Sequence, residues 1–195
     1  GRTMRPRLCW DPLEQTLLRV GFVDAAVLRA AMETAFGASD ATGAWDWKLA
    51  YEACEVATVL FLRKYGKALF RKAASPAARA SVLAKIAGLL PTQTRRTEES
   101  QNFQQFSTPL PLGLAALSAA AIAPDDVVLE PSAGTGLLAI LAQTAGGSLI
   151  LNELAETRAD LLGHLPQSDL PCFTFAADEC AELQTIVGHM SLSPV

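Results

Sequence analysis

The chain has 195 residues, which is enough for one domain or for a small domain with an appended segment. Half of its residues are hydrophobic and 18% are charged, and this balance excludes an intrinsically disordered chain. The longest apolar tract, residues 112–123, is shorter than the ~20 residues of a membrane-spanning helix, and the first residues lack a signal-peptide pattern. We therefore expect a folded protein without a membrane partner.

The charges are distributed unevenly, although the formal net charge is only −4. Residues 63–96 carry nine basic side chains and no acidic one, whereas residues 97–195 carry one basic side chain and twelve acidic ones. The basic block is either a solvated surface that attracts the acidic block or a surface that contacts a polyanion such as DNA. In the second case the candidates for nucleic-acid contact are Lys64, Lys67, Arg71, Arg95 and Arg96.

The cysteines and histidines indicate neither a metal site nor a disulfide scaffold. The four cysteines are widely separated, no Cys-x-x-Cys pair occurs, and the chain has only two histidines. We expect buried free thiols in a reducing cytoplasm, and no bound metal.

The first half of the chain has the periodicity of helices. Apolar residues recur at helical spacing over residues 12–36, and glycines and polar residues then interrupt the pattern. A second helix is expected from an N-cap at Asp46 to about Lys72, and a third from the Ser75-Pro76 pair to residue 90. Residues 92–105 are polar and aperiodic, as in a linker or a loop over a site.

The second half alternates between short apolar runs and helical segments. Strands are expected at residues 127–129, 148–151 and 172–175, and helices at residues 137–145 and 154–165. This alternation is typical of a parallel α/β sheet. We therefore predict the α/β class, with a helical N-terminal region followed by a partial Rossmann-like sheet.

Three regions are expected along the chain. Residues 1–91 form the helical region, residues 92–107 a linker or cofactor lid, and residues 108–195 a partial ligand-binding domain.

The most informative segment is Val-Val-Leu-Glu-Pro-Ser-Ala-Gly-Thr-Gly, at residues 127–136. It predicts a strand that ends at Glu130, followed by a turn whose glycines allow a ligand to approach the backbone closely. Open α/β sheets bind ligands at the carboxyl ends of their strands. The segment therefore supplies the candidate binding residues Glu130, Pro131, Ser132, Ala133, Gly134 and Gly136.

Two ligands compete for this turn. The spacing Gly134-x-Gly136-x-x-Ala139 matches the pattern of NAD-binding turns. An acidic residue four positions before the first glycine, followed by proline, is instead typical of class I S-adenosylmethionine (SAM) methyltransferases. A carboxylate favours the cationic sulfonium of SAM and repels a pyrophosphate, and the turn contains no Lys or Arg. SAM is therefore favoured over NAD, and a tight turn without a ligand is the third interpretation.

Two further acids follow the other expected strands. Glu153 lies 23 residues after Glu130, where a carboxylate binds ribose hydroxyls in this class of fold, or else favours the start of a helix. Asp178 follows the third strand, where it would contact the adenine amino group or act as an ordinary N-cap.

The segment Gln-Gln-Phe-Ser-Thr-Pro, at residues 104–109, resembles the Q-F-x-T-P segment of N6-adenine DNA methyltransferases. The resemblance implies that Phe106 packs near the cofactor and that Thr108 and Pro109 cap a helix over its methionine end. The residues alone also predict an N-cap at Ser107 or Thr108 before a helix that begins near Pro109.

Further segments look like one bacterial group, the N-terminal methyltransferase-like region of strawberry-notch-type proteins, in which this module precedes a DEAD/DEAH-type helicase. They are residues 45–48, 51–55, 60–64, 94–100, 130–136 and 152–158. The resemblance spans about residues 40–165 and implies a SAM cofactor, a DNA substrate, a helicase region in the same or a neighbouring polypeptide, and a bacterial cytoplasmic location.

One element of that family is absent from this sequence. The family continues to a fourth strand ending in Asn-Pro-Pro-Phe, which binds the target adenine, and no such tetrapeptide occurs here. We therefore nominate no catalytic residue and expect the SAM-binding part of a DNA (adenine-N6) methyltransferase-like protein. The alternative is a degenerate, non-catalytic module that acts as an interaction or nucleic-acid-binding domain.

Overall fold

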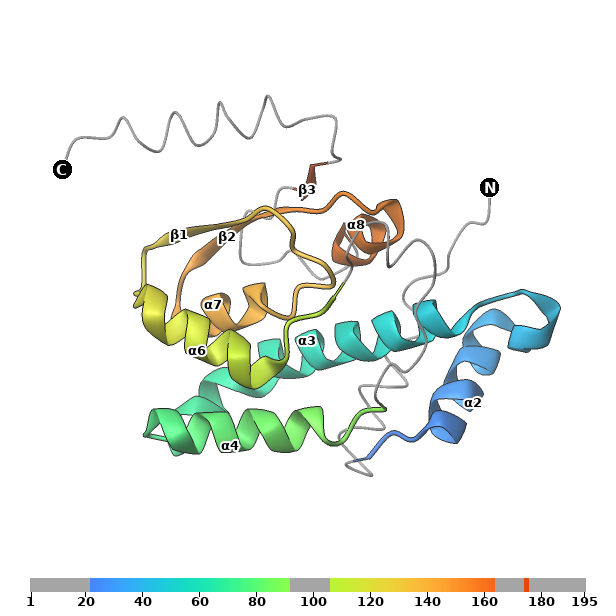
Figure 1. The fold of residues 1–195 in the computed structure, drawn as a ribbon, viewed down its shortest axis with the longest axis horizontal. Coiled ribbons are helices and arrows are strands. Elements are labelled where there is room, and N and C mark those ends of the chain that lie inside the picture. The colour runs from blue at the N-terminus through green and yellow to red at the C-terminus, as the bar shows by residue number, and fades with distance from the viewer. Residues whose placement is uncertain (1–21, 92–105, 164–173, 176–195) are drawn as a thin grey trace.

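The structure, a computed structural model, describes residues 22–91, 106–163 and 174–175, and in them a small parallel sheet lies above the helices α3, α4, α6 and α7 in the view of Figure 1. The predicted α/β class is therefore confirmed, in the sense that helices and a parallel sheet occur together. In chain order the elements are α2 (Ala25–Phe36), the short 3-10 helix η1 (Asp40–Thr42), α3 (Trp47–Lys72), α4 (Pro76–Ala87), α6 (Leu110–Ala120), β1 (Val127–Glu130), α7 (Ala139–Ala145), β2 (Ser148–Asn152), α8 (Glu156–Gly163) and β3 (Thr174–Phe175).

The helices α2, α3 and α4 begin at side-chain N-caps. The carboxylates of Asp24 and Asp46 accept the backbone N–H groups of Val27 and Leu49 at 2.8 Å, and the hydroxyl of Ser75 accepts that of Ala78 at 3.2 Å. Each bond satisfies a backbone donor that the first helical turn leaves free. The predicted starts of α3 and α4 are confirmed.

Four predicted helix bounds are wrong. The expected helix 12–36 does not pass through residues 22–24, since α2 begins after its cap at Asp24, and residues 12–21 lie outside the described part. The helix α4 ends at Ala87, three residues earlier than predicted, because turns follow from Gly88. The starts of α7 and α8 are each two residues later than expected, because the turns after β1 and β2 take up those positions.

The N-cap predicted for the helix after residue 107 is also wrong. The N-cap of α6 is Pro109, which makes no side-chain capping bond, so neither Ser107 nor Thr108 has this role. The Ser107 hydroxyl hydrogen-bonds instead with the carboxyl group of Glu55, on α3.

The sheet has the order β1-β2-β3, and its described strands are all parallel. Val127 pairs with Ser148 and Glu130 with Leu151, while Leu151 pairs in turn with Thr174. Parallel neighbours need a crossover, and the helices α7 and α8 lie in the two crossovers. The carboxyl ends of the strands therefore meet at one edge, as predicted from the alternating pattern.

The long helix α3 joins the helical region to the sheet. Its 26 residues extend about 39 Å at 1.5 Å per residue. One apolar cluster packs α2 against the first half of α3 and includes Leu161 of α8, and another packs the second half of α3 against α4, α6 and α7. Gly66 allows α3 to approach α7 closely, because a Cβ there would lie 3.1 Å from the Thr144 hydroxyl on α7. The helical region thus packs against α6, α7 and α8, whereas the buried residues of β2 form a separate cluster with α7 and α8.

None of the helices in the described ranges combines the length and the apolar character needed to cross a bilayer.

Candidate functional site

A cavity of about 350 Å³ lies at the carboxyl edge of the sheet. Its wall is formed by the segment before α6, the turn after β1 and the turn after β2. The lining residues are Phe106, Ser107, Thr108, Glu130, Ser132, Ala133, Gly134, Thr135, Leu137, Leu138, Glu153, Leu154 and Arg158. Seven residues predicted from the sequence are among them, namely Phe106, Thr108, Glu130, Ser132, Ala133, Gly134 and Glu153.

The glycine-containing turn crosses from β1 toward α7 and is bonded to the end of β2. The Ala133 N–H donates to the carbonyl of Asn152 at 2.8 Å, and the Asn152 side-chain amide donates to the carbonyl of Pro131 at 3.0 Å. Gly134 has a φ of +58°, a left-handed conformation that glycine adopts without strain. A Cβ at Gly134 would lie 3.6 Å from Arg158 Nη1, on the cavity wall.

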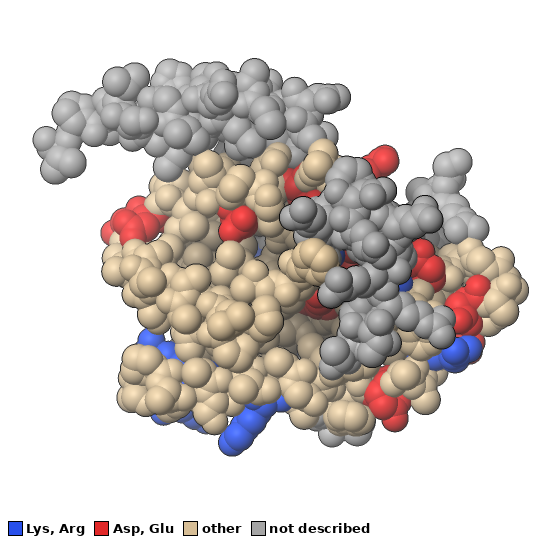
Figure 2. All heavy atoms as spheres, viewed as in Figure 1, with Lys and Arg blue, Asp and Glu red and all other residues tan. Residues whose placement is uncertain are grey.

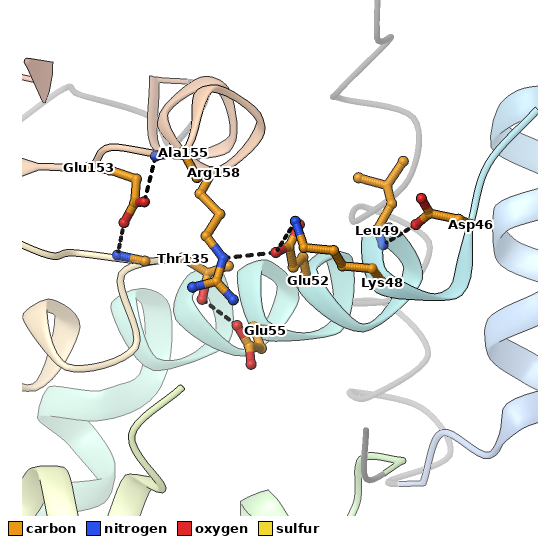
Figure 3. A network of polar contacts seen from close by, with 10 residues as sticks. Asp46, Lys48, Leu49, Glu52, Glu55, Thr135, Glu153, Ala155 and Arg158 are labelled. Carbon is orange, nitrogen blue, oxygen red and sulfur yellow. Dashed lines mark hydrogen bonds and ion pairs between the residues drawn. The ribbon is translucent and has the colours of Figure 1, made fainter. Parts of the chain in front are cut away.

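Both predicted carboxylates bond backbone N–H groups. Glu153 is 6% exposed, and its two oxygens accept the N–H groups of Gly134 at 2.7 Å and Ala155 at 2.8 Å (Figure 3). Glu130 Oε1 accepts the N–H of Ser132 at 3.1 Å. Glu153 therefore fixes the glycine-containing turn to the end of β2 while its side chain lines the cavity.

The remaining predicted cofactor residues either are not among those that line the cavity or lie outside the described part. Pro109 precedes α6, the carbonyl of Pro131 accepts the Asn152 bond, and Gly136 has a φ of +91° and donates its N–H to the carbonyl of Ala133 at 2.9 Å. Asp178 lies outside the described residues.

Sequence reasoning missed a charged network beneath the turn. Arg158 of α8 donates from Nε to Glu52 Oε1 at 2.8 Å, and Lys48 Nζ lies 3.4 Å from the same oxygen (Figure 3). All three side chains are buried, with residue exposures of 6%, 2% and 8% for Arg158, Glu52 and Lys48. The network ties α3 to α8, and its guanidinium group lines the cavity.

A second carboxyl group of α3 contacts the cavity wall directly. The Thr135 hydroxyl donates to Glu55 Oε2 at 2.6 Å, and Ser107 bonds the same carboxyl group. Burial raises the pKa of Glu55 above its ordinary value of 4.5, and the charge of Glu52 adds to this rise, while both hydroxyls and Arg158 oppose it.

The raised pKa of Glu55 predicts a pH dependence of stability. Because the folded state binds this proton more tightly than the unfolded chain, the contribution of Glu55 is present in full below pH 4.5 and is lost as pH rises through the folded pKa. Glu55→Gln has no such proton, so its free energy of unfolding relative to wild type should rise with pH above about 4.5. Urea denaturation at several pH values measures this difference. A difference that stays constant or falls contradicts the assignment.

The predicted nucleic-acid residues lie elsewhere on the molecule. Lys64, Lys67 and Arg71 are exposed on the second half of α3, while Arg95 and Arg96 are outside the described residues. Twelve residues separate Glu55 from Lys67, which is about 18 Å along the helix. In Figure 2, basic side chains gather at the lower left, where Figure 1 has α4 and the end of α3.

A groove of about 250 Å³ lies beside this basic surface, between α3 and the end of α7. Arg63 and Lys67 line it from α3, and Gln143 and Thr144 line it from α7. The two cations and the amide are suitable donors for a phosphate group, while the Thr144 hydroxyl donates to the carbonyl of Ile140 at 2.7 Å.

Among the described residues, no group of three or more His, Cys, Asp or Glu side chains is placed to bind a metal ion. Cys54 is free and buried, and burial raises the pKa of its thiol to about 12, so the thiol is protonated at neutral pH. Cys9, Cys172 and Cys180 lie outside the described part.

Comparison with protein-family models, with curated proteins and with solved structures finds no match for this chain.

Proposed function

We propose that this chain binds SAM and is the cofactor-binding part of a DNA (adenine-N6) methyltransferase-like protein of the bacterial cytoplasm, associated with a helicase, with a partial Rossmann-like fold. The observation that carries the proposal is the cavity bounded by the glycine-containing turn at the carboxyl edge of the sheet. Its volume of about 350 Å³ is within the usual range for small-molecule sites, about 300–1,000 Å³.

The charges around the cavity support SAM rather than a dinucleotide. Glu130 and Glu153 line it together with one cation, Arg158, which is already paired with Glu52. A pyrophosphate would meet two carboxylates and no lysine in the turn, whereas the sulfonium of SAM is attracted to them. When bound, SAM supplies an electrophilic methyl group.

Three wall residues have roles suited to this ligand. The carboxylate of Glu153 has about four acceptor sites, so the two backbone bonds leave capacity for ribose hydroxyls. Phe106 and Leu154 are 58% and 54% exposed on the wall, and we expect them to lose this exposure against the apolar parts of the ligand. The resemblance places Thr108 and Pro109 at the methionine end and Asp178 at the adenine.

A thermal-shift series with SAM and S-adenosylhomocysteine tests this proposal. A ligand that binds only the folded state raises its stability by about 2.7 kcal/mol at a hundred times Kd. We expect both compounds to raise Tm, and SAM to bind more tightly because only SAM carries the sulfonium charge. No shift with either compound would contradict the proposal.

We further propose that DNA binds to the basic end of α3. Its phosphates would lie in the groove that Arg63 and Lys67 line. Supporting this are the exposure of Lys64, Lys67 and Arg71 and the lack of acidic residues between Glu55 and Glu98. Such contacts position the backbone and carry no sequence information.

Reversing three of these charges, in Lys64→Glu/Lys67→Glu/Arg71→Glu, should weaken DNA binding for every sequence. It should also flatten the dependence of log affinity on log salt by about 2–3, since each phosphate contact contributes about 0.9. Fluorescence anisotropy with labelled duplex and single strands across a salt series measures both effects. The same variant should keep its SAM affinity, because the cavity lies toward the other end of α3. If the variant has the same salt slope as wild type, these basic side chains do not contact DNA and only face solvent.

A further inference from the structure

One carboxyl group bonds residues from two segments of the cavity wall. Glu55 accepts the hydroxyl of Thr135 at 2.6 Å and hydrogen-bonds with Ser107. Thr135 belongs to the glycine-containing turn and Ser107 to the segment before α6, and both residues line the cavity. The two wall segments are 28 positions apart in the chain, and Glu55 is a further 52 positions before Ser107. Neither wall segment can therefore form this connection through its own local structure.

We infer that Glu55 is a positioning residue of the cavity, which sets the separation of its two walls by bonding Thr135 and Ser107 together. Glu55 is only partly exposed and is supported by a helix that packs into the core on several sides. The helix α3 thus holds two segments that lie outside helices and strands, and its bond to Thr135 adds to the bonds that tie the turn to the end of β2. Where the occupant is SAM, this inference rests on the proposed function and adds a residue from the helical region to its site.

The surroundings of Glu55 distinguish this role from that of its neighbours. Glu52, on the same helix, bonds Arg158 and Lys48 rather than Thr135 or Ser107, and Arg158 acts on Glu55 through its charge. Cys54, the adjacent titratable group, is buried and protonated at neutral pH. A neutral acceptor at position 55 can still accept one hydroxyl and donate to the other, so the role does not require the negative charge.

Hydrogen exchange on the full chain tests the inference without any ligand. We compare wild type with Glu55→Ala and Glu55→Gln, using Thr58→Ala as a matched control. Thr58 is buried one turn further along α3, and its hydroxyl donates to the Cys54 carbonyl of its own helix. Glu55→Ala should speed amide exchange about tenfold in both residues 106–109 and residues 131–138, as expected for the loss of one bond of typical strength. Glu55→Gln should remain near wild type.

Titration of SAM provides the second measurement. Glu55→Ala should weaken SAM binding about tenfold, whereas Glu55→Gln should bind within about threefold of wild type. If wild type binds no SAM, the proposed function fails and the exchange experiment alone decides the role of Glu55. The inference is overturned if Glu55→Ala leaves either wall unchanged, if Glu55→Gln loosens the walls as much as Glu55→Ala, or if Thr58→Ala loosens them equally.

Discussion

Replacing Arg158 with alanine is expected to lower the free energy of unfolding by about 3–5 kcal/mol, because it leaves the buried carboxylate of Glu52 without its closest partner. Arg158 Nε lies 2.8 Å from Glu52 Oε1, and Glu52 is only 2% exposed. Glu52 Oε2 has no hydrogen-bond partner among the described residues, so the carboxylate then depends on Lys48, whose Nζ lies 3.4 Å from Oε1. Urea denaturation of wild type and variant measures the difference.

Two controls separate burial from charge. Arg29→Ala breaks a partly exposed ion pair with Asp40, in which Nη1 and Oδ1 are 3.1 Å apart, and it also removes a contact with the Trp47 ring. Together these losses should lower the free energy of unfolding by no more than about 1–2 kcal/mol. Replacing all three members of the network, in Lys48→Met/Glu52→Leu/Arg158→Met, should recover most of the loss, because none of its charges is then left in the core. An Arg158→Ala variant as stable as Arg29→Ala would show that Glu52 is not dependent on Arg158.

Replacing Gly134 with valine is expected to weaken SAM binding at least about a hundredfold, a cost of about 2.7 kcal/mol. The branched side chain would project from the turn toward the cavity wall, because a Cβ added at Gly134 would lie 3.6 Å from Arg158 Nη1. It would also have to adopt the φ of +58°, which costs an L-residue about 1–2 kcal/mol. Isothermal titration of SAM into the folded variant measures the loss.

Gly37 offers a matched control for the strain. It has a φ of +68° at the end of α2, and a Cβ there would have no neighbour within 4 Å. Gly37→Val therefore has a similar backbone cost but leaves the cavity unchanged, and it should bind SAM as wild type does. Equal affinities of the Gly134 and Gly37 variants would show that the turn does not contact the ligand.

The sequence was sufficient for elements whose signals are local. Asp46 and the Ser75-Pro76 pair marked the starts of α3 and α4, because capping depends on residues within one turn. The turn from Glu130 to Gly136 indicated the position of the cavity, because strand, glycines and helix follow one another directly. The helix ends were less accurate, since turn residues near Gly88 and before Ala139 also fit a helical pattern.

The polar residues beneath the turn could not be predicted from local pattern. Thr135 and Glu55 are 80 residues apart, and Arg158 and Glu52 are 106 apart, so their bonds exist only once α3 packs beside the sheet. A signal was nevertheless present. Glu52 and Glu55 interrupt an otherwise apolar part of α3, and Arg158 is the only basic residue in the last 99. A carboxylate at a buried position needs a charged or hydrogen-bonding partner. The single basic residue of the second half of the chain was therefore a reasonable candidate for that partner.

The most direct test of the central proposal is a calorimetric titration of SAM and, separately, of NAD⁺ into the wild-type chain. We expect SAM to bind saturably at one site per chain, because the cavity presents Glu130 and Glu153 to its sulfonium. We expect no binding of NAD⁺ under the same conditions, because the same carboxylates repel its pyrophosphate. Absence of SAM binding, or NAD⁺ binding as tightly as SAM, would contradict the assignment of this cavity.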